Sequence, residues 1–182
     1  MTQLEAHLGG HDNVTHVDQG ALQWACDQWG IKSMIDVGCG PGGQVELATS
    51  MGIDAIGIDG DHTVSRFDDT KFVIHDYTKG VAPVSGQWDL CWSVEFVEHV
   101  YARYTLNFIK NMMQCRWIIM SHAKPGQTGY HHVNCQHSDY WVSELNKYGF
   151  RYDARLSSQM RKSSTAKKKF LRKSGLVFIN EH

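Results

Sequence analysis

The sequence predicts an α/β fold built on a parallel sheet, and three observations support this class. Short runs rich in β-branched residues alternate with helical stretches, which is the pattern of parallel β-α units. An apolar run over 34–37 leads into a glycine-rich turn, as at the end of a strand that precedes a helix. The 182 residues, of which 42% are hydrophobic, suffice for a substantial core, and we expect 1–182 to form a single domain.

Three helices are expected from local patterns. Apolar residues recur at helical spacing over 18–29, and Gly30 ends this helix. A second helix begins at about Gln44, where the glycine-rich turn ends. A third, over 138–148, starts with a serine that can serve as its cap and is followed directly by Gly149.

The glycine-rich turn predicts a nucleotide-cofactor site. Glycines let the backbone approach a ligand closely or adopt positive φ, and the N–H groups of the next helix form a slightly positive rim. Gly38, Gly40 and Gly43 also satisfy the dinucleotide fingerprint, with Asp59 as the later acid. The carboxylate of Asp36, two residues before the first glycine, suits a ligand with an ammonium group and repels a pyrophosphate. The turn therefore favours S-adenosylmethionine over a nicotinamide dinucleotide.

The run D-V-G-C-G-P-G at 36–42 resembles the glycine motif of class I S-adenosylmethionine-dependent methyltransferases, and later segments continue the resemblance over roughly 20–180. This resemblance implies a Rossmann-like, seven-stranded, mostly parallel sheet with an antiparallel last strand and helices on both faces. The first strand is expected at 34–37. The resemblance places the other six strands at 55–59, 72–76, 88–93, 116–120, 150–152 and 175–179.

The same resemblance implies roles for particular side chains in cofactor binding. Asp59 takes both ribose hydroxyls, and Asp76 or its neighbour contacts the adenine amine. The expected cofactor-binding residues are Asp36, Gly38, Cys39, Gly40, Gly42, Asp59, Gly60, Asp76, Tyr77 and Ser93.

A second cluster, E-F-V-E-H at 95–99, follows the fourth strand directly. If 95–108 is a helix, Glu95, Glu98 and His99 stand at i, i+3 and i+4 and share one face. Two carboxylates and an imidazole suit a divalent cation. The plainer alternative is that the acids stabilise a helix start and that the histidine bonds to the backbone.

The E-x-x-E-H motif resembles that of two methyltransferase groups, the enzymes that methylate the 3′-terminal 2′-hydroxyl of small RNAs and the ubiquinone-pathway catechol O-methyltransferases. In the first group these residues bind a metal with a further histidine after the fifth strand, for which His132 is expected here and His131 is the alternative. The resemblance thus implies a site for Mg²⁺ or Mn²⁺ formed by Glu95, Glu98, His99 and His132. Glu95, His99 and His132 are also the expected catalytic residues, and without a metal either histidine is a candidate general base.

Charge and composition set further limits. Eight basic residues and no acid lie between 154 and 180, so the segment 155–173 is a candidate surface for nucleic acid, the alternative being a solvated connection between the last two strands. Residues 1–17 are a candidate lid. No run of about 18 apolar residues exists, and the five cysteines form no C-x-x-C pair. We expect a cytoplasmic protein with reduced thiols and no membrane segment.

Three functions remain open at this point. The first is methylation of a hydroxyl on a small molecule, sugar or RNA end by S-adenosylmethionine, with or without Mg²⁺ or Mn²⁺. The second is a non-catalytic nucleic-acid-binding module that uses the basic segment. The third is an NAD(P)-dependent oxidoreductase, which the carboxylate of Asp36 and the lack of a separate catalytic domain disfavour.

Overall fold

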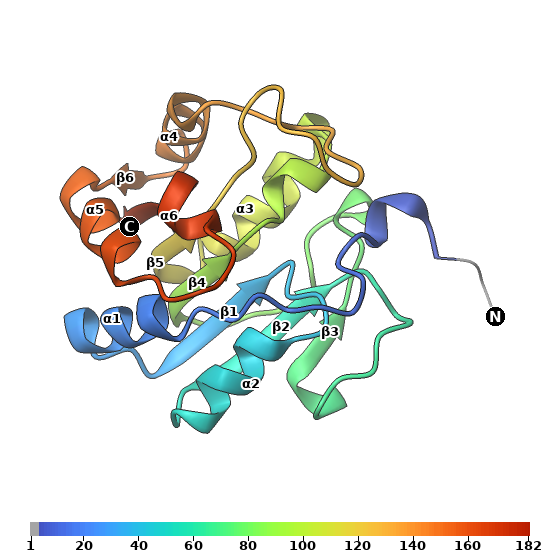
Figure 1. Ribbon diagram of the computed structural model, residues 1–182, viewed down its shortest axis with the longest axis horizontal. Coiled ribbons are helices and arrows are strands. Elements are labelled where there is room, and N and C mark those ends of the chain that lie inside the picture. The colour runs from blue at the N-terminus through green and yellow to red at the C-terminus, as the bar shows by residue number, and fades with distance from the viewer. Residues whose placement is uncertain (1–3) are drawn as a thin grey trace.

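Seven strands pair into one sheet in the computed structural model, which describes residues 4–182 (Figure 1). The order is β3-β2-β1-β4-β5-β7-β6, and β7 runs antiparallel to both of its neighbours while the other pairs are parallel. This arrangement confirms the predicted fold class. The strands are β1 Ser33–Val37, β2 Asp54–Asp59, β3 Phe72–Ile74, β4 Trp88–Ser93, β5 Cys115–Met120, β6 Phe150–Tyr152 and β7 Leu176–Asn180.

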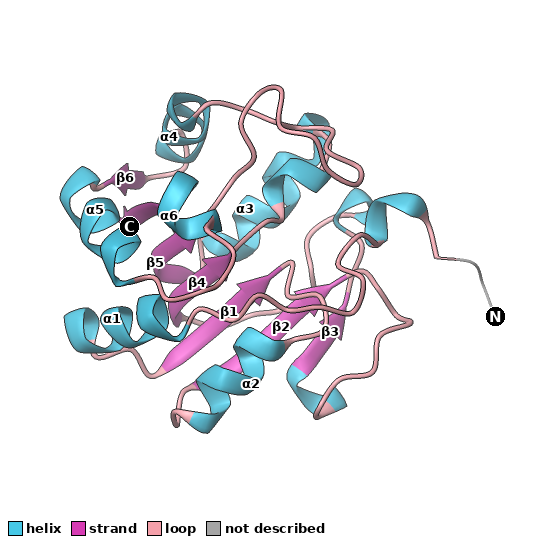
Figure 2. Ribbon diagram, in the orientation of Figure 1, coloured by secondary structure: helices cyan, strands magenta, loops and turns pink. Residues whose placement is uncertain are grey.

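Between residues 4 and 182, six α-helices and five short 3₁₀ helices precede or connect these strands (Figure 2). The α-helices are α1 Gln19–Trp29, α2 Gly43–Ser50, α3 Thr105–Met112, α4 Ser138–Asn146, α5 Ala154–Ser163 and α6 Phe170–Ser174. The 3₁₀ helices are η1 Ala6–Leu8, η2 Asp69–Lys71, η3 Tyr77–Lys79, η4 Val97–His99 and η5 Ala102–Tyr104. Among residues 4–182, no helix has the length and apolarity needed to cross a membrane.

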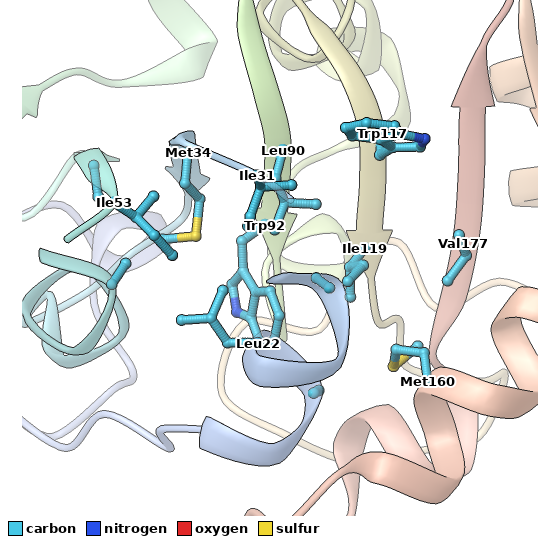
Figure 3. Packing of buried hydrophobic residues seen from close by; sticks show 14 of the residues in the cluster. Leu22, Ile31, Met34, Ile53, Leu90, Trp92, Trp117, Ile119, Met160 and Val177 are labelled. Carbon is cyan, nitrogen blue, oxygen red and sulfur yellow. The ribbon is translucent and has the colours of Figure 1, made fainter. Parts of the chain in front are cut away.

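Side chains of the central strands alternate between two cores, one on each face of the sheet. Met34 of β1 and Leu90 of β4 belong to the core beneath α1, α2, α5 and α6 (Figure 3). Their neighbours Ile35 and Cys91 belong to the other core, which is covered by α3 and α4. Both faces of the sheet are therefore buried, which explains the continuous apolar runs of the central strands.

The ends of α1 match the sequence prediction, whereas the start of α4 differs from it. Asp18 caps α1 by accepting a hydrogen bond from the N–H of Ala21, and Gly30 ends the helix in the left-handed conformation at φ 63°. At α4 the cap position is His137, and Ser138 is the first helical residue. The Ser138 hydroxyl forms a hydrogen bond with His122 Nε2 at 3.0 Å, which links the start of α4 to the loop after β5.

The single helix expected over 95–108 is wrong. The chain instead forms η4, η5 and then α3, and Glu95 adopts the left-handed conformation with φ 55°. The cause lies far along the sequence, because the carbonyl of Glu98 accepts hydrogen bonds from the N–H groups of Val133 (2.9 Å) and Asn134 (3.0 Å). That carbonyl is therefore not free to accept the bond that a continuing helix requires.

The buried carboxylate of Asp18 also joins distant parts of the chain. Besides capping α1, it accepts hydrogen bonds from the Ser164 hydroxyl and from the N–H of Thr165, at 2.9 Å for the second bond. The N–H of Asp18 donates to Gln44 Oε1 of α2 at 2.9 Å. The connection between α5 and α6 is thereby attached to the segment that precedes α1, at the end of the sheet where β1 stops.

Candidate functional site

A cavity of about 440 Å³ lies at the carboxyl ends of the central strands. Its walls come from the N-terminal segment 7–16, the turn after β1, the ends of β2 and β4, the loop after β5 and the connection before α6. Parallel α/β sheets place their ligand sites at this edge, where the order of the strands reverses. The volume is in the range of small-molecule and cofactor sites.

The glycines of the turn after β1 are required by close packing against aromatic rings. Gly38 has φ 79°, and a Cβ built on it would lie 2.3 Å from the ring of Phe96. Gly42 has φ 86°, and its Cβ would lie 2.3 Å from the ring of Phe72. Both positions therefore exclude larger residues on conformational and on steric grounds.

The carboxylate of Asp59 holds this turn in place. Its Oδ2 accepts a hydrogen bond from the N–H of Gly40 at 2.8 Å, and its Oδ1 accepts one from the N–H of Asp61. Arg66 adds a second connection, because its Nε donates to the Gly40 carbonyl at 3.2 Å and its guanidinium donates to the carbonyl of Asp61 at 2.9 Å. No motif in the sequence indicated Arg66, since its neighbours have no regular pattern.

Asp36 contributes a buried carboxylate to the cavity, with 3% of its surface exposed. Burial and the nearby charge of Asp59 raise the pKa of Asp36 well above its usual value. A cationic group bound beside Asp36 would oppose both effects and favour the charged carboxylate. The chemistry of this position thus suits a ligand with an ammonium group.

Asp76 and Tyr77 stand where the chain leaves β3. Asp76 caps η3 through the N–H and hydroxyl of Thr78, and its Oδ1 lies 3.2 Å from Nε2 of His7. The Tyr77 ring packs edge to face on Phe96, and its buried hydroxyl has no hydrogen-bond partner among the described residues. The N-terminal segment therefore reaches over this end of the cavity, although residues 1–3 of the predicted lid lie outside the described part of the chain.

Eight of the ten predicted cofactor residues line the cavity, and two do not. The eight are Asp36, Gly38, Cys39, Gly40, Asp59, Gly60, Asp76 and Tyr77. Gly42 lies behind the turn against Phe72, and Ser93 is fully buried with its hydroxyl donating to the Val37 carbonyl at 3.0 Å. The contacts of these two residues are thus with the protein itself.

Three residues of the second predicted cluster, Glu95, His99 and His132, line the same cavity, whereas Glu98 is fully buried and is not part of its wall. The hydrogen bonds from the 133–134 backbone to Glu98 fold the loop after β5 back onto η4 and bring His132 beside His99. Their ring centroids are 5.0 Å apart, edge to face. One ligand atom from each of Glu98, His99 and His132 lies within 4.8 Å of the other two.

Glu98 has an unusual environment for an acid. It is fully buried, and among the described residues neither carboxylate oxygen has a hydrogen-bond partner. Burial, followed by the charge of Glu95, raises the pKa of Glu98 well above its usual value. Burial and the neighbouring His132 lower the pKa of His99 to about 4, so its imidazole is neutral at pH 7. An orphaned carboxylate beside two imidazoles has the donor set of a divalent-cation site.

Two further residues of the predicted set differ in their surroundings. Glu95 is bonded to Ser121, and its carboxylate lies outside the close cluster formed by the other three ligand atoms. His132 donates from Nδ1 to the Gln127 carbonyl at 3.1 Å, which fixes the ring and leaves Nε2 as the free acceptor. The alternative ligand His131 lies instead with Tyr101 and His7, at centroid distances of 5.5 and 6.2 Å.

Sequence reasoning missed the residues that support the site. Ser121, directly after β5, holds Glu95, and the hydroxyl of Thr15 accepts a hydrogen bond from the first N–H of α2 at Gly43. Thr15 lies in the segment predicted as a lid, and a polar residue at a strand end was the available signal for Ser121. Neither assignment could be made without knowing which segments meet.

The sequence matches no protein-family model and no curated protein. Solved structures with similar folds include the TehB-like SAM-dependent methyltransferase from Corynebacterium glutamicum, at 13% identity over 89% of this chain and 88% of that one, with a TM-score of 0.64. The methyltransferase domain of bacterial CtHen1 gives 15% identity over 88% of this chain and 96% of that one, with a TM-score of 0.57.

Magnesium protoporphyrin IX methyltransferase (ChlM) from Synechocystis, solved with bound SAH, gives 15% identity over 88% of this chain and 80% of that one, with a TM-score of 0.57. These structural similarities and the observed strand order indicate the same fold. The chain has the fold of the class I S-adenosylmethionine-dependent methyltransferases.

Proposed function

We propose that the protein is an S-adenosylmethionine-dependent methyltransferase that methylates a hydroxyl group with the help of a divalent cation. The observation that carries this proposal is that a single cavity is lined by two chemically different groups. The glycine turn with Asp36 and Asp59 forms one part of its wall, and Glu95, His99 and His132 form another. A methyl donor and an acceptor held by these two groups meet within one space.

The cofactor part of the cavity fits S-adenosylmethionine by charge and by space. The cofactor carries a sulfonium and an ammonium group, and the wall offers the carboxylates of Asp36 and Asp59. These acids oppose a pyrophosphate, so the oxidoreductase alternative is disfavoured. Gly40 is left-handed with φ 51° and projects no side chain into the cavity, so its backbone can approach a ligand there.

The acceptor part of the cavity fits a divalent cation. Glu98, His99 and His132 would hold it, with Glu95 as the fourth residue, and the carboxylates favour Mg²⁺ or Mn²⁺. When bound, such an ion supplies positive charge that lowers the pKa of an acceptor hydroxyl. The fit rests on the two Glu98 oxygens, which are buried without a partner among the described residues.

The protein's own contribution to the reaction is alignment, exclusion of water and proton transfer. In methyl transfer the hydroxyl oxygen forms a bond to the methyl carbon as the carbon–sulfur bond breaks, so the sulfonium becomes a neutral thioether and the hydroxyl proton leaves to a base. Where no ion is bound, the free Nε2 of His132 is the candidate proton acceptor.

The direct test is calorimetric titration of S-adenosylhomocysteine, followed by Mn²⁺, into metal-free protein. We expect both ligands to bind the wild type and only S-adenosylhomocysteine to bind Glu98→Ala. Glu46→Ala is the matched control, because Glu46 is an exposed acid of α2. Absence of S-adenosylhomocysteine binding to the wild type would refute the proposed function, and unchanged Mn²⁺ binding by Glu98→Ala would refute the proposed cation site.

The nature of the acceptor is tested with the same protein. Hydroxyl compounds of three classes, namely phenols, sugars and RNA 3′ ends, are incubated with radiolabelled cofactor and Mn²⁺. Transfer to an oxygen supports the proposal. Transfer only to nitrogen or carbon acceptors would contradict it.

A further inference from the structure

The charges on the cavity wall are strongly unequal. Five acids line it, namely Asp12, Asp36, Asp59, Asp76 and Glu95. Among the lining residues between positions 4 and 182, Lys168 is the only lysine or arginine. A negatively charged ligand group that enters this cavity therefore has one permanent cation to meet.

Lys168 has no competing partner within the described chain. Its side chain is exposed, and none of the ion pairs found among residues 4–182 involves it. His16 also lines the cavity, and its pKa is lowered by burial and by the charge of Lys168. His16 is therefore neutral at pH 7 and adds no second positive charge beside Lys168.

The backbone that carries Lys168 is fixed by several hydrogen bonds. Asp18 binds Ser164 and Thr165, and the Thr165 hydroxyl accepts a bond from the N–H of Gly20 at 2.9 Å. Arg172 donates to the Ala166 carbonyl from the other side. The connection between α5 and α6, seen beside the start of α1 in Figure 1, is thus held against the N-terminal part of the fold.

The residues beside Lys168 complete this part of the wall. Phe170 lines the cavity and packs on His16, with ring centroids 5.3 Å apart. Lys167 and Lys169 are exposed and absent from the wall, although they are adjacent in sequence. The fold therefore selects one of three consecutive lysines to face the cavity.

We infer that Lys168 binds the carboxylate at the amino-acid end of the cofactor, an inference that rests on the proposed function. S-adenosylmethionine has an ammonium and a carboxylate group on one carbon atom. Asp36 offers a partner for the ammonium, whereas the wall formed by the described residues offers the carboxylate no other lysine or arginine. Lys168 supplies the missing positive charge, so this pair distinguishes the complete cofactor from analogues without the amino-acid end.

The test compares two ligands that differ in this end alone. S-adenosylhomocysteine carries the ammonium and carboxylate, and 5′-methylthioadenosine lacks both. Calorimetric dissociation constants are measured for the wild type, Lys168→Ala and the matched controls Lys167→Ala and Lys169→Ala. We expect Lys168→Ala to weaken S-adenosylhomocysteine binding about tenfold, because a charge-assisted contact is lost. Binding of 5′-methylthioadenosine should be unchanged, and both controls should resemble the wild type.

Each other outcome overturns the inference in an identifiable way. If the wild type binds neither ligand, the proposed function fails and the inference fails with it. If the wild type binds S-adenosylhomocysteine and Lys168→Ala binds it equally well, the inference alone is wrong. Equal weakening of both ligands also overturns it, because the effect is then not on the carboxylate. An unchanged cofactor constant with a raised KM for an anionic acceptor assigns Lys168 to the acceptor instead.

Discussion

The hydroxyl of Ser121 joins the backbone and the side chain of Glu95. It accepts a hydrogen bond from the Glu95 N–H at 3.0 Å and donates one to Oε1 at 3.2 Å. Glu95 has φ 55°, a conformation that costs a residue with a side chain roughly 1–2 kcal/mol. Ser121 thus offsets this cost and sets the direction of the Glu95 carboxylate.

Replacement of Ser121 by alanine should weaken the proposed cation site without affecting the cofactor. Loss of a residue that orients a metal ligand typically lowers metal affinity about 10- to 100-fold. We expect a loss of about tenfold for Mn²⁺ and an unchanged dissociation constant for S-adenosylhomocysteine, both by calorimetry. Ser138→Ala, which removes a hydroxyl bonded to His122, is the control. Equal Mn²⁺ affinity in Ser121→Ala and the wild type would show that Glu95 needs no support.

Replacement of Glu98 by glutamine should stabilise the metal-free protein. The pKa of Glu98 is raised in the folded state, so its ionisation opposes folding as the pH rises above the unfolded value of about 4.5. Glutamine does not ionise, so the variant should gain stability over the wild type between pH 5 and pH 8, reaching about 1–3 kcal/mol.

This effect is measured by urea denaturation in EDTA at several pH values, with Glu46→Gln as the exposed control. Added Mn²⁺ should reverse the order, because only the wild type is stabilised by binding. A variant that is less stable than the wild type at every pH would contradict the prediction.

Replacement of Asp18 by alanine should destabilise the whole fold. The substitution removes the cap of α1 and leaves the buried Ser164 hydroxyl and the N–H of Thr165 without their acceptor. We expect a loss of about 3 kcal/mol in the free energy of unfolding, measured with urea. Asp27→Ala, at an exposed position near the other end of α1, should change it by less than about 0.5 kcal/mol. Comparable losses in the two variants would mean that the distant bonds of Asp18 contribute little.

Substitutions at two glycines with nearly equal φ can distinguish the cost of backbone strain from the cost of a steric clash. Gly38 (φ 79°) lies against Phe96, whereas Gly52 (φ 78°) has open space where a Cβ would be. Gly52→Ala should cost about 1 kcal/mol, for backbone strain alone. Gly38→Ala should cost about 3 kcal/mol and weaken S-adenosylhomocysteine binding, since the ring of Phe96 must move. Thermal denaturation and calorimetry measure the two effects, and similar results for both variants would contradict the role of Phe96.

Local patterns predicted the elements whose causes are local. The capping acid and the left-handed glycine of α1 both lie within one turn of the helix that they bound, so 18–29 could be recognised from the sequence. The sheet as a whole could not be derived in this way, because strand pairing depends on contacts between distant segments. The expectation of seven mostly parallel strands with an antiparallel last strand came from a resemblance of 36–42 and later runs to a known class, and the observed sheet confirms it.

The site was predictable in composition and less so in geometry. Glu98 and His99 were expected on a long helix, and the structure gives a single 3₁₀ turn because the Glu98 carbonyl binds backbone some 35 residues later. Arg66 and Ser121 support the two halves of the site through contacts that no spacing rule encodes. Long-range hydrogen bonds therefore determined the parts that sequence reasoning missed.

The hydrogen bond between Asp18 and Thr165 spans 147 residues of sequence. The wall that carries Lys168 comes from residues that follow β6, so it is synthesised after β1 to β5, at whose carboxyl ends the cavity lies. During synthesis on the ribosome, a nascent chain that has not yet emerged beyond 164–170 has the glycine turn but lacks this wall. Cofactor affinity should consequently rise late in translation, and ligand binding would report the completion of folding.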